Sequence, residues 1–270
     1  MEKYYDQKNK RLVFIKEQAS ADFWDKHWDF KNFKEEVKEK AKDDFVCKMT
    51  KKYLISSSRV KILEGGCGDG HFVYSLNKDG YNAYGIDYAS QTIKKIKQNF
   101  PKLQVYEGDI RKIDFPKNFF DAYWSLGVIE HFYYGYEDIL AEMKRVIKKD
   151  GYLFLTFPYM SILRKLKVKF NKYKKFKDTT EPDNFYQFAL DYKKVLSDLE
   201  KIGFELKNKK FLNGKKGLKD EIIVLEPWIR KINQGRGFIY KFLRKILSVT
   251  LDFWAAHSVL LILKNKTKLK

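Results

Sequence analysis

Cysteine is scarce in this sequence, which contains only Cys47 and Cys67 among its 270 residues. The two lie far apart and belong to none of the closely spaced cysteine and histidine patterns that bind metals. A disulfide-stapled fold is therefore excluded, and we expect no metal site. The scarcity also fits a reducing compartment.

Long hydrophobic runs are missing as well. The longest uninterrupted apolar run covers residues 259–263, which is far too short to span a bilayer. Residues 1–8 contain no apolar core of the kind that marks a signal peptide. We therefore expect a cytoplasmic protein, either free or peripheral at the inner face of a membrane.

Arginine is rare although the chain is strongly basic. Lysine and arginine number 55 against 35 acidic residues, a formal net charge of +20, yet only eight of the 55 are arginine. The charge favours an anionic partner, either nucleic acid or a lipid surface. Because arginine recognises phosphates and bases bidentately, a lysine excess gives little support to specific nucleic-acid binding. A hydrophobic content of 44% excludes wholesale disorder, and the length suits one large domain.

Residues 60–70 carry the most informative pattern. A short apolar run ends at Glu64, four glycines follow within six residues, and an apolar helical pattern starts at Phe72. This order predicts a buried strand, a tight turn and a helix N-terminus, where a ligand meets bare backbone. The dinucleotide and Walker fingerprints both fail, because each requires a residue other than His71 at that position. A carboxylate at Glu64 would repel phosphate and suits a cationic ligand end.

The acid-x-Gly-x-Gly-x-Gly pattern of Glu64, Gly66, Gly68 and Gly70 resembles the first motif of the class I S-adenosylmethionine-dependent methyltransferases. The resemblance continues in order through most of the chain. It implies S-adenosylmethionine as the cofactor and a Rossmann-like α/β fold, with a seven-stranded, mostly parallel sheet, helices on both faces and an antiparallel last strand. The residue pattern itself predicts strands at 83–87, 104–107, 119–125, 152–157 and 257–264, and helices at 71–78, 136–147 and 192–202.

Asp87 ends the second predicted strand, seventeen residues after Gly70. In the family an acid at this place accepts hydrogen bonds from two ribose hydroxyls, and a carboxylate can do so bidentately. The alternative is that Asp87 only caps a helix that begins near Ser90. The resemblance also makes Tyr88 a candidate to stack on adenine.

The resemblance implies further cofactor contacts. Asp109 follows the third strand and would accept from the adenine amine, and the backbone N–H of Ile110 would face a ring nitrogen. Ser125 lies at the end of the fourth strand, where substrate and methyl donor meet. The contacts implied within the glycine motif are Glu64, Gly66, Cys67 and Gly68.

Ile129-Glu130-His131 follows the fourth predicted strand. In the family this ending is typical of the branch that acts on small molecules, quinones, sugars and lipids. The Asn-Pro-Pro-Tyr motif common in base-modifying branches is absent. Glu130 and His131 are therefore the candidate catalytic residues. A neutral His131 imidazole either takes a proton from a hydroxyl nucleophile or only shapes the pocket.

Residues 1–58 precede the glycine turn and are rich in charge and aromatic side chains. Phe23, Trp24 and Trp28 stand at helical spacing, and we expect two helices in this region. Family members often fold N-terminal helices over the cofactor, so residues 1–58 are a candidate helical lid with Phe23 and Trp24 as cover residues. The alternative is ordinary packing at the sheet edge.

Two basic insertions, at about residues 159–190 and 214–256, lie where substrate choice resides in the family. Tyr159 opens the first and is a candidate substrate or lid contact. Both combine basic side chains with apolar residues at helical spacing, which predicts helices in a membrane interface, or else helices packed on the core. The apolar positions are Ile162, Leu166, Phe170 and Tyr173 in the first, and Phe238, Ile239, Phe242, Leu243, Ile246, Leu247, Val249 and Phe253 in the second, with Arg236, Lys241, Arg244 and Lys245 beside them.

The sequence thus predicts one methyltransferase domain, residues 59–270, behind the N-terminal lid. The expected reaction is O-methylation of a sugar, isoprenoid or lipid-linked metabolite, with contact to an anionic membrane. One alternative is an RNA methyltransferase that uses the basic surface. The other is a non-catalytic, cofactor-binding interaction module.

Overall fold

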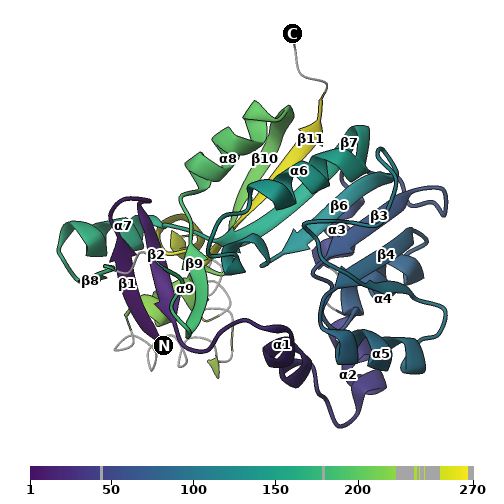
Figure 1. Ribbon diagram of the computed structural model, residues 1–270, viewed down its shortest axis with the longest axis horizontal. Helices are drawn as coiled ribbons and strands as arrows, with labels where there is room; N and C mark the ends of the chain where they lie inside the picture. Colours follow the sequence, from purple (N-terminus) through teal and green to yellow (C-terminus); the bar gives the residue numbers. More distant parts are fainter. Residues whose placement is uncertain are drawn as a thin grey trace.

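A computed structural model describes residues 1–42, 45–177, 180–222, 234–235, 237, 240 and 250–266. Seven of the described strands form a central sheet in the order β10-β11-β7-β6-β3-β4-β5 (Figure 1). The sheet is parallel from β7 to β5, while β11 pairs antiparallel with both β10 and β7. The predicted Rossmann-like fold is confirmed. Its strands are β3 (Lys61–Gly65), β4 (Asn82–Asp87), β5 (Gln104–Glu107), β6 (Phe120–Leu126), β7 (Ile147–Pro158), β10 (Phe204–Leu212) and β11 (Ser258–Asn265).

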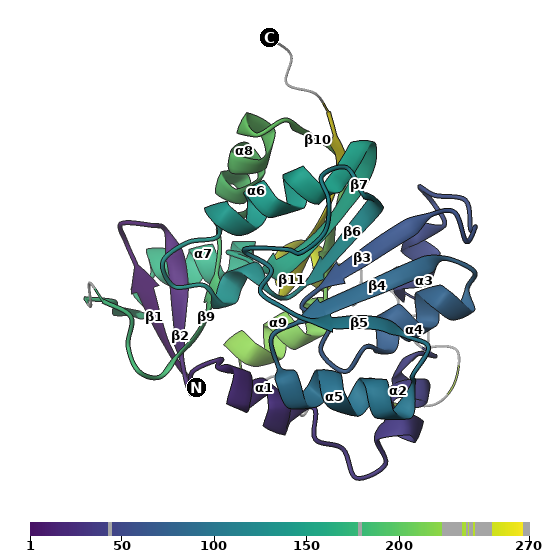
Figure 2. The ribbon, with the colours of Figure 1, turned by 45° about the vertical axis from the view of Figure 1, so that its right-hand side comes forward.

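The central strands are apolar on both faces because helices cover both sides of the sheet (Figure 2). Apolar side chains of α6 (Glu137–Val146) and α8 (Tyr192–Lys201) belong to one core cluster. Those of α4 (His71–Lys78) and α5 (Ser90–Asn99) belong to a second. The two clusters meet at β3, where Leu63 faces the first and Ile62 the second.

The N-terminal prediction is wrong for the first fifteen residues, which form a hairpin of β1 (Glu2–Asp6) and β2 (Arg11–Ile15) instead of a helix. The hairpin joins a four-stranded accessory sheet in the order β8-β1-β2-β9. The reason lies in β2, whose side chains are buried on alternate faces. Val13 enters the main core, while Leu12 and Phe14 pack in a separate cluster on the other face.

Helices follow the hairpin, as the sequence predicts, although three are found in place of two in the described part of residues 16–58. They are α1 (Ala21–His27), α2 (Phe33–Lys40) and α3 (Phe45–Thr50). Ser20 caps α1 by accepting a hydrogen bond from the backbone N–H of Phe23. The division into a lid and a catalytic domain stays a prediction.

The first insertion contains the expected helix, α7 (Ile162–Lys169). After the short edge strand β8 (Lys174–Lys175) comes β9 (Phe185–Ala189), which pairs antiparallel with β2. The second insertion begins with α9 (Gly214–Glu221). Outside the described residues lie Arg236, Phe238, Ile239, Lys241, Phe242, Leu243, Arg244, Lys245, Ile246, Leu247 and Val249.

None of the described helices is both long enough and apolar enough to cross a bilayer.

Candidate active site

A cavity of about 380 Å³ opens at the carboxyl ends of the central strands. Backbone from the turns after β3, β4, β5 and β6 forms its floor, and α1 with the segment before it forms its cover. Ligands of open parallel sheets bind at this edge. The lining residues are Gln18, Ala19, Trp24, Trp28, Gly66, Gly68, Asp87, Tyr88, Gly108, Asp109, Ile110, Arg111, Leu126, Gly127, Val128, His131 and Phe132.

The glycine turn presents bare backbone to this cavity. Gly66 and Gly68 have φ angles of +76° and +50°, which disfavour any residue with a side chain. A Cβ atom at Gly68 would lie 2.8 Å from the ring of Trp28, and one at Gly66 would lie 2.5 Å from Val128. The turn is therefore a cradle that only glycine can form.

Asp87 stands at the end of β4 with only 6% of its surface exposed. Its Oδ2 accepts a hydrogen bond from the backbone N–H of Gly68 at 2.8 Å, and Oδ1 accepts from Ala89 at 3.0 Å. Burial raises the pKa of this carboxyl, and the backbone donors oppose that rise. The carboxylate thus lines the cavity and retains lone pairs for a ligand.

The alternative role predicted for Asp87, capping the helix near Ser90, is filled by Asp25 of α1. Asp25 accepts from the backbone N–H and the hydroxyl of Thr92, both at 2.7 Å. It also accepts from the N–H of Gln91 at 3.3 Å. One carboxylate therefore caps α5 and fastens α1 beside the cavity.

The aromatic side chains of α1 cover the cavity. Trp24 and Trp28 both line it, with ring centroids 6.3 Å apart and planes at 18°. Phe23 lies further out, packed edge-on against Trp24 and Tyr186. The hydroxyl of Tyr88 donates to the carbonyl of Ala19 at 2.6 Å, which ties the strap before α1 to the end of β4.

Trp28 is held over the glycine turn by a polar network. Lys40 places its ammonium 4.6 Å from the Trp28 ring and 2.9 Å from the carboxylate of Asp69. The other oxygen of Asp69 lies 2.5 Å from Nδ1 of His71, the residue that excludes both phosphate fingerprints. Asp69 is fully buried, so its carboxylate is shielded from water.

His131 also lines the cavity, from the short 3-10 helix η1 (Ile129–His131). Its Nδ1 lies 2.6 Å from the carbonyl oxygen of Tyr186. Because a carbonyl only accepts, Nδ1 carries the proton and Nε2 keeps its lone pair. Burial lowers the pKa of His131 to about 4, although the bond to Tyr186 opposes this shift. The imidazole is therefore neutral at neutral pH.

Glu130, its neighbour, points elsewhere. Its side chain is buried, its Oε2 has no hydrogen-bond partner, and it does not line the cavity. Burial raises the pKa of Glu130 to about 8, so the group is largely protonated at neutral pH. A direct chemical role for Glu130 therefore has no geometric support.

Asp109 and Ile110 line the cavity as predicted, but Asp109 is already engaged. Its carboxylate takes the guanidinium of Arg111 at 2.7 Å and 3.0 Å, and this partner lowers the pKa of Asp109. Arg111 itself lines the cavity and was not predicted. Its only sequence signal is its place two residues after Asp109.

The remaining predicted site residues do not line the cavity. Glu64 and Cys67 are buried behind the glycine turn, and Ser125 is fully buried on β6. Oε2 of Glu64 has no hydrogen-bond partner, and burial raises its pKa well above the usual range. Tyr159 is buried beside Arg164, and its carbonyl accepts a hydrogen bond from the Arg164 guanidinium.

Sequence reasoning also missed several lining residues. The sequence places Trp28 in a helix but does not assign it to the site. Its position on the same helical face as Trp24 could have indicated that it lines the cavity. Gln18, Ala19 and Phe132 gave no recognisable signal, because they line the cavity only through the docking of the N-terminal strap and η1.

Comparison with known proteins gives independent evidence about the family of this chain. Residues 63–155 match the family model described as "Methyltransferase domain". A probable S-adenosylmethionine-dependent methyltransferase of Mycolicibacterium smegmatis is 24% identical over 97 residues, which is 36% of this chain and 37% of that protein. One from Mycobacterium tuberculosis is 23% identical over 97 residues, covering 36% and 35%. The match thus spans just over a third of the length of these curated relatives.

Solved structures share the fold. An S-adenosylmethionine-dependent methyltransferase from Mesorhizobium loti superposes with a TM-score of 0.54 at 14% identity, covering 81% of this chain and 96% of that one. A putative sarcosine dimethylglycine methyltransferase from Galdieria sulphuraria gives a TM-score of 0.53 at 13% identity, covering 83% and 85%. The [4+2]-cyclase SpnF has a TM-score of 0.51 at 14% identity, covering 83% and 81%, so the fold alone does not specify the reaction.

The methyltransferase assignment therefore depends on the matched segment and the relatives that share it, and the fold agrees with it. Residues 63–155 hold the glycine turn, Asp87 and His131, and this segment matches a methyltransferase domain and resembles S-adenosylmethionine-dependent methyltransferases.

Proposed function

We propose that this protein binds S-adenosylmethionine in the cavity under α1 and transfers its methyl group to a hydroxyl of a small molecule. The observation that carries the proposal is that one cavity is lined by two kinds of feature. The glycine cradle and the Asp87 carboxylate suit the cofactor, and His131 presents an available Nε2.

The cavity residues suit this cofactor chemically. The cradle of Gly66 and Gly68 leaves backbone room that a Cβ would fill. Asp87 offers acceptor lone pairs to a ribose diol, and the ring of Tyr88 offers a face to adenine. Glu64 keeps an unpartnered buried oxygen behind the turn, and a positive charge nearby would offset the burial that raises its pKa.

S-adenosylmethionine, when bound, supplies a methyl group already activated by the sulfonium. The protein therefore has to bind, orient and desolvate. Trp24 and Trp28 cover the cavity and exclude water from it. His131 accepts the hydrogen bond of the acceptor hydroxyl at Nε2, orients its oxygen and receives its proton. A pKa of about 4 makes this imidazole a weak base, so orientation is the larger part of its role.

For the acceptor we propose a sugar, isoprenoid or lipid-linked metabolite presented at an anionic membrane. Support comes from His131, whose neutral imidazole suits a hydroxyl nucleophile, and from the net charge of +20. The cytoplasmic, membrane-peripheral location belongs to the same proposal.

Isothermal titration with S-adenosylmethionine tests the proposal. Asp87→Ala should weaken binding by roughly 2–4 kcal/mol, because it removes two charge-assisted hydrogen bonds. Asp114→Ala is the matched control, since Asp114 is exposed and does not line the cavity. An unchanged binding isotherm for a folded Asp87→Ala variant would contradict the assignment of Asp87 to the cofactor site. Transfer of labelled methyl groups to polyprenyl, glycolipid and RNA acceptors then identifies the substrate class.

A further inference from the structure

Helix α7 buries cationic side chains against the protein and exposes large apolar ones to solvent. Arg164 is 0% exposed and Lys167 is half-buried, so the face against the protein carries two cations. Ser161 caps the helix through the N–H of Arg164. Helices at protein surfaces normally bury their apolar stripe, so this orientation requires a specific cause.

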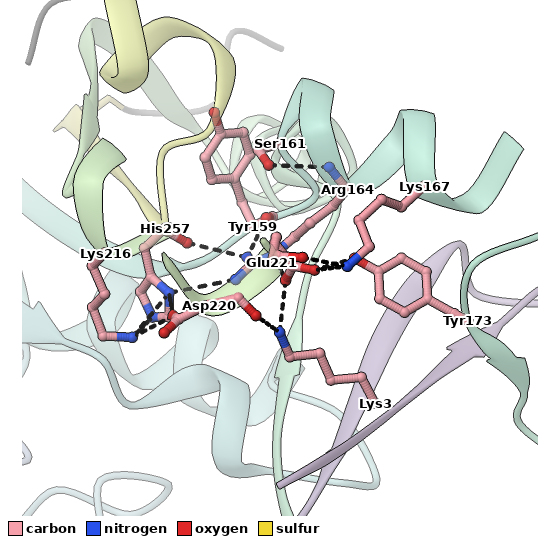
Figure 3. Close-up of polar contacts among 10 residues, drawn as sticks. All are labelled: Lys3, Tyr159, Ser161, Arg164, Lys167, Tyr173, Lys216, Asp220, Glu221 and His257. Carbon is pink, nitrogen blue, oxygen red and sulfur yellow. Dashed lines mark hydrogen bonds and ion pairs between the residues drawn. The ribbon is translucent and has the colours of Figure 1, made fainter. Parts of the chain in front are cut away.

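The cause is a buried polar network centred on Glu221 at the end of α9 (Figure 3). One carboxylate oxygen of Glu221 accepts from Nε of Arg164 at 3.1 Å and from Lys3 at 2.9 Å. The other accepts from Lys167 at 2.8 Å and from the hydroxyl of Tyr173 at 2.6 Å. All four donors converge on one buried acid.

Arg164 is also held by backbone. Its Nη1 donates to the carbonyl of Tyr159 at 2.7 Å and to that of His257 at 3.2 Å. Turning α7 about its axis would break these bonds and take Arg164 and Lys167 away from the buried Glu221. The network therefore fixes which face of α7 points outward.

The outward face carries a row of large apolar side chains. Ile162, Leu166 and Phe170 follow one another at intervals of four residues and are 37%, 39% and 65% exposed. Their apolar area is thus left in water while a cation occupies the inner face. Such a patch, held open by a buried network, marks an interaction surface.

Lysines surround this row. Residues 159–177 contain no acid. The short strand β8 follows α7 at the edge of the accessory sheet, and both lie at the same end of the molecule in the two views (Figures 1 and 2). The exposed lysines are Lys165, which lies 3.9 Å from Asp191, and Lys169, Lys172, Lys174, Lys175 and Lys177.

We infer that the outer face of α7, together with β8, docks on an anionic lipid bilayer. Aliphatic side chains enter the acyl boundary while lysines meet the headgroups, which is the pattern of an interfacial helix. Lysine is depleted at protein–protein interfaces, and apolar side chains make no hydrogen bonds to bases or phosphates. The inference rests on the proposed membrane contact but not on methyl transfer.

Sedimentation with vesicles tests the inference without cofactor or acceptor. The protein should sediment with vesicles of equal parts phosphatidylglycerol and phosphatidylcholine, lose binding as salt rises, and ignore pure phosphatidylcholine. Changing Ile162, Leu166 and Phe170 together to Gln should weaken partitioning by about tenfold or more. Changing Lys169, Lys172 and Lys175 together to Gln should weaken it by about a hundredfold.

Matched controls alter exposed residues elsewhere. Ile55→Gln with Tyr134→Gln removes comparable exposed apolar groups, and Gln at Lys102, Lys117 and Lys149 removes the same charge. Both controls should bind vesicles like the unaltered protein, which supports the inference. Equal losses in controls and α7 variants would overturn it. So would RNA capture or self-association through α7 without vesicle binding.

Cofactor titration of the same variants separates the two proposals. Vesicle binding without S-adenosylmethionine binding would leave the inference standing and remove the proposed function. The reverse result would remove only the inference.

Discussion

Replacing Glu221 by Gln keeps the size of the side chain and removes its charge, which makes it a sharp test of the buried network. The side chain of Glu221 is 1% exposed and that of Arg164 is 0% exposed. Lys3 and Lys167 are 14% and 24% exposed, so these two ammonium groups can turn towards water. Arg164 cannot, and in the variant it would stay buried without a counter-charge.

The expected cost follows from that difference. Removing one partner of a buried pair typically destabilises by about 3–5 kcal/mol, whereas exposed pairs contribute roughly 0–1 kcal/mol. We therefore expect Glu221→Gln to lower the free energy of unfolding by about 3 kcal/mol or more at neutral pH. In a chain of this size each kcal/mol corresponds to roughly 2–4 °C in Tm.

The pH dependence gives a second signature. Burial alone would raise the pKa of Glu221, but Arg164, Lys3, Lys167 and Tyr173 outweigh it and hold the pKa at about 2, below its usual 4.5. A carboxyl group whose pKa is lower in the folded state than in the unfolded state stabilises the fold at pH values above its unfolded-state pKa. That contribution is lost as the pH falls through its folded-state pKa. The unaltered protein should lose about 3 kcal/mol from this group between pH 4.5 and 2, and Glu221→Gln should not.

Urea unfolding, followed by circular dichroism at neutral pH and at several acidic values, measures both effects. Glu39→Gln is the control, because Glu39 pairs with Lys42 on the surface and its removal should leave stability nearly unchanged. A loss below about 1 kcal/mol at neutral pH for Glu221→Gln would refute the reasoning, since it would mean that Arg164 finds water or another acceptor.

Two further predictions concern the site. His131→Ala should lower turnover about a hundredfold and leave cofactor affinity unchanged. This is the low end of the usual range for general acid–base catalysis, because the imidazole is a weak base. Near-normal turnover in methyl-transfer kinetics would mean that His131 has only a structural role. Asp25→Ala should cost about 1 kcal/mol by uncapping α5 and should speed amide exchange in α1. Asp22→Ala is the control, because Asp22 is exposed on the same helix. Equal rates of amide exchange in the two variants would contradict the role of Asp25 in fastening α1 to α5.

Much of the central fold was predictable because its signals are local. The strand, glycine turn and helix at residues 61–78 follow from a short apolar run, positive φ angles that suit glycine, and an apolar helical face. Asp87 could be placed for the same reason, since the end of a parallel strand fixes which sheet edge its side chain reaches. The fold class and the family are confirmed, whereas the roles of the individual site residues stay predictions.

Local signals failed where side chains depend on distant partners. Ser125 and Tyr159 were expected at the site, but packing in the core and beside Arg164 keeps both away from the cavity. The hairpin was missed because β2 is defined by its pairing with β9, which lies far along the chain. Apolar periodicity in a short window does not reveal such a partner.

The sequence by itself determined the order of the central strands and helices, the glycine cradle and the acid at the end of β4, since each depends on residues within a few positions of one another. Only the tertiary structure decided that Asp25 caps α5 across 67 residues and that Arg164 faces Glu221 across 57. The pattern of α7 marks an apolar side without saying whether that side faces the core. A buried carboxylate drew the cations inward, because leaving it unpaired would cost more than exposing three apolar side chains.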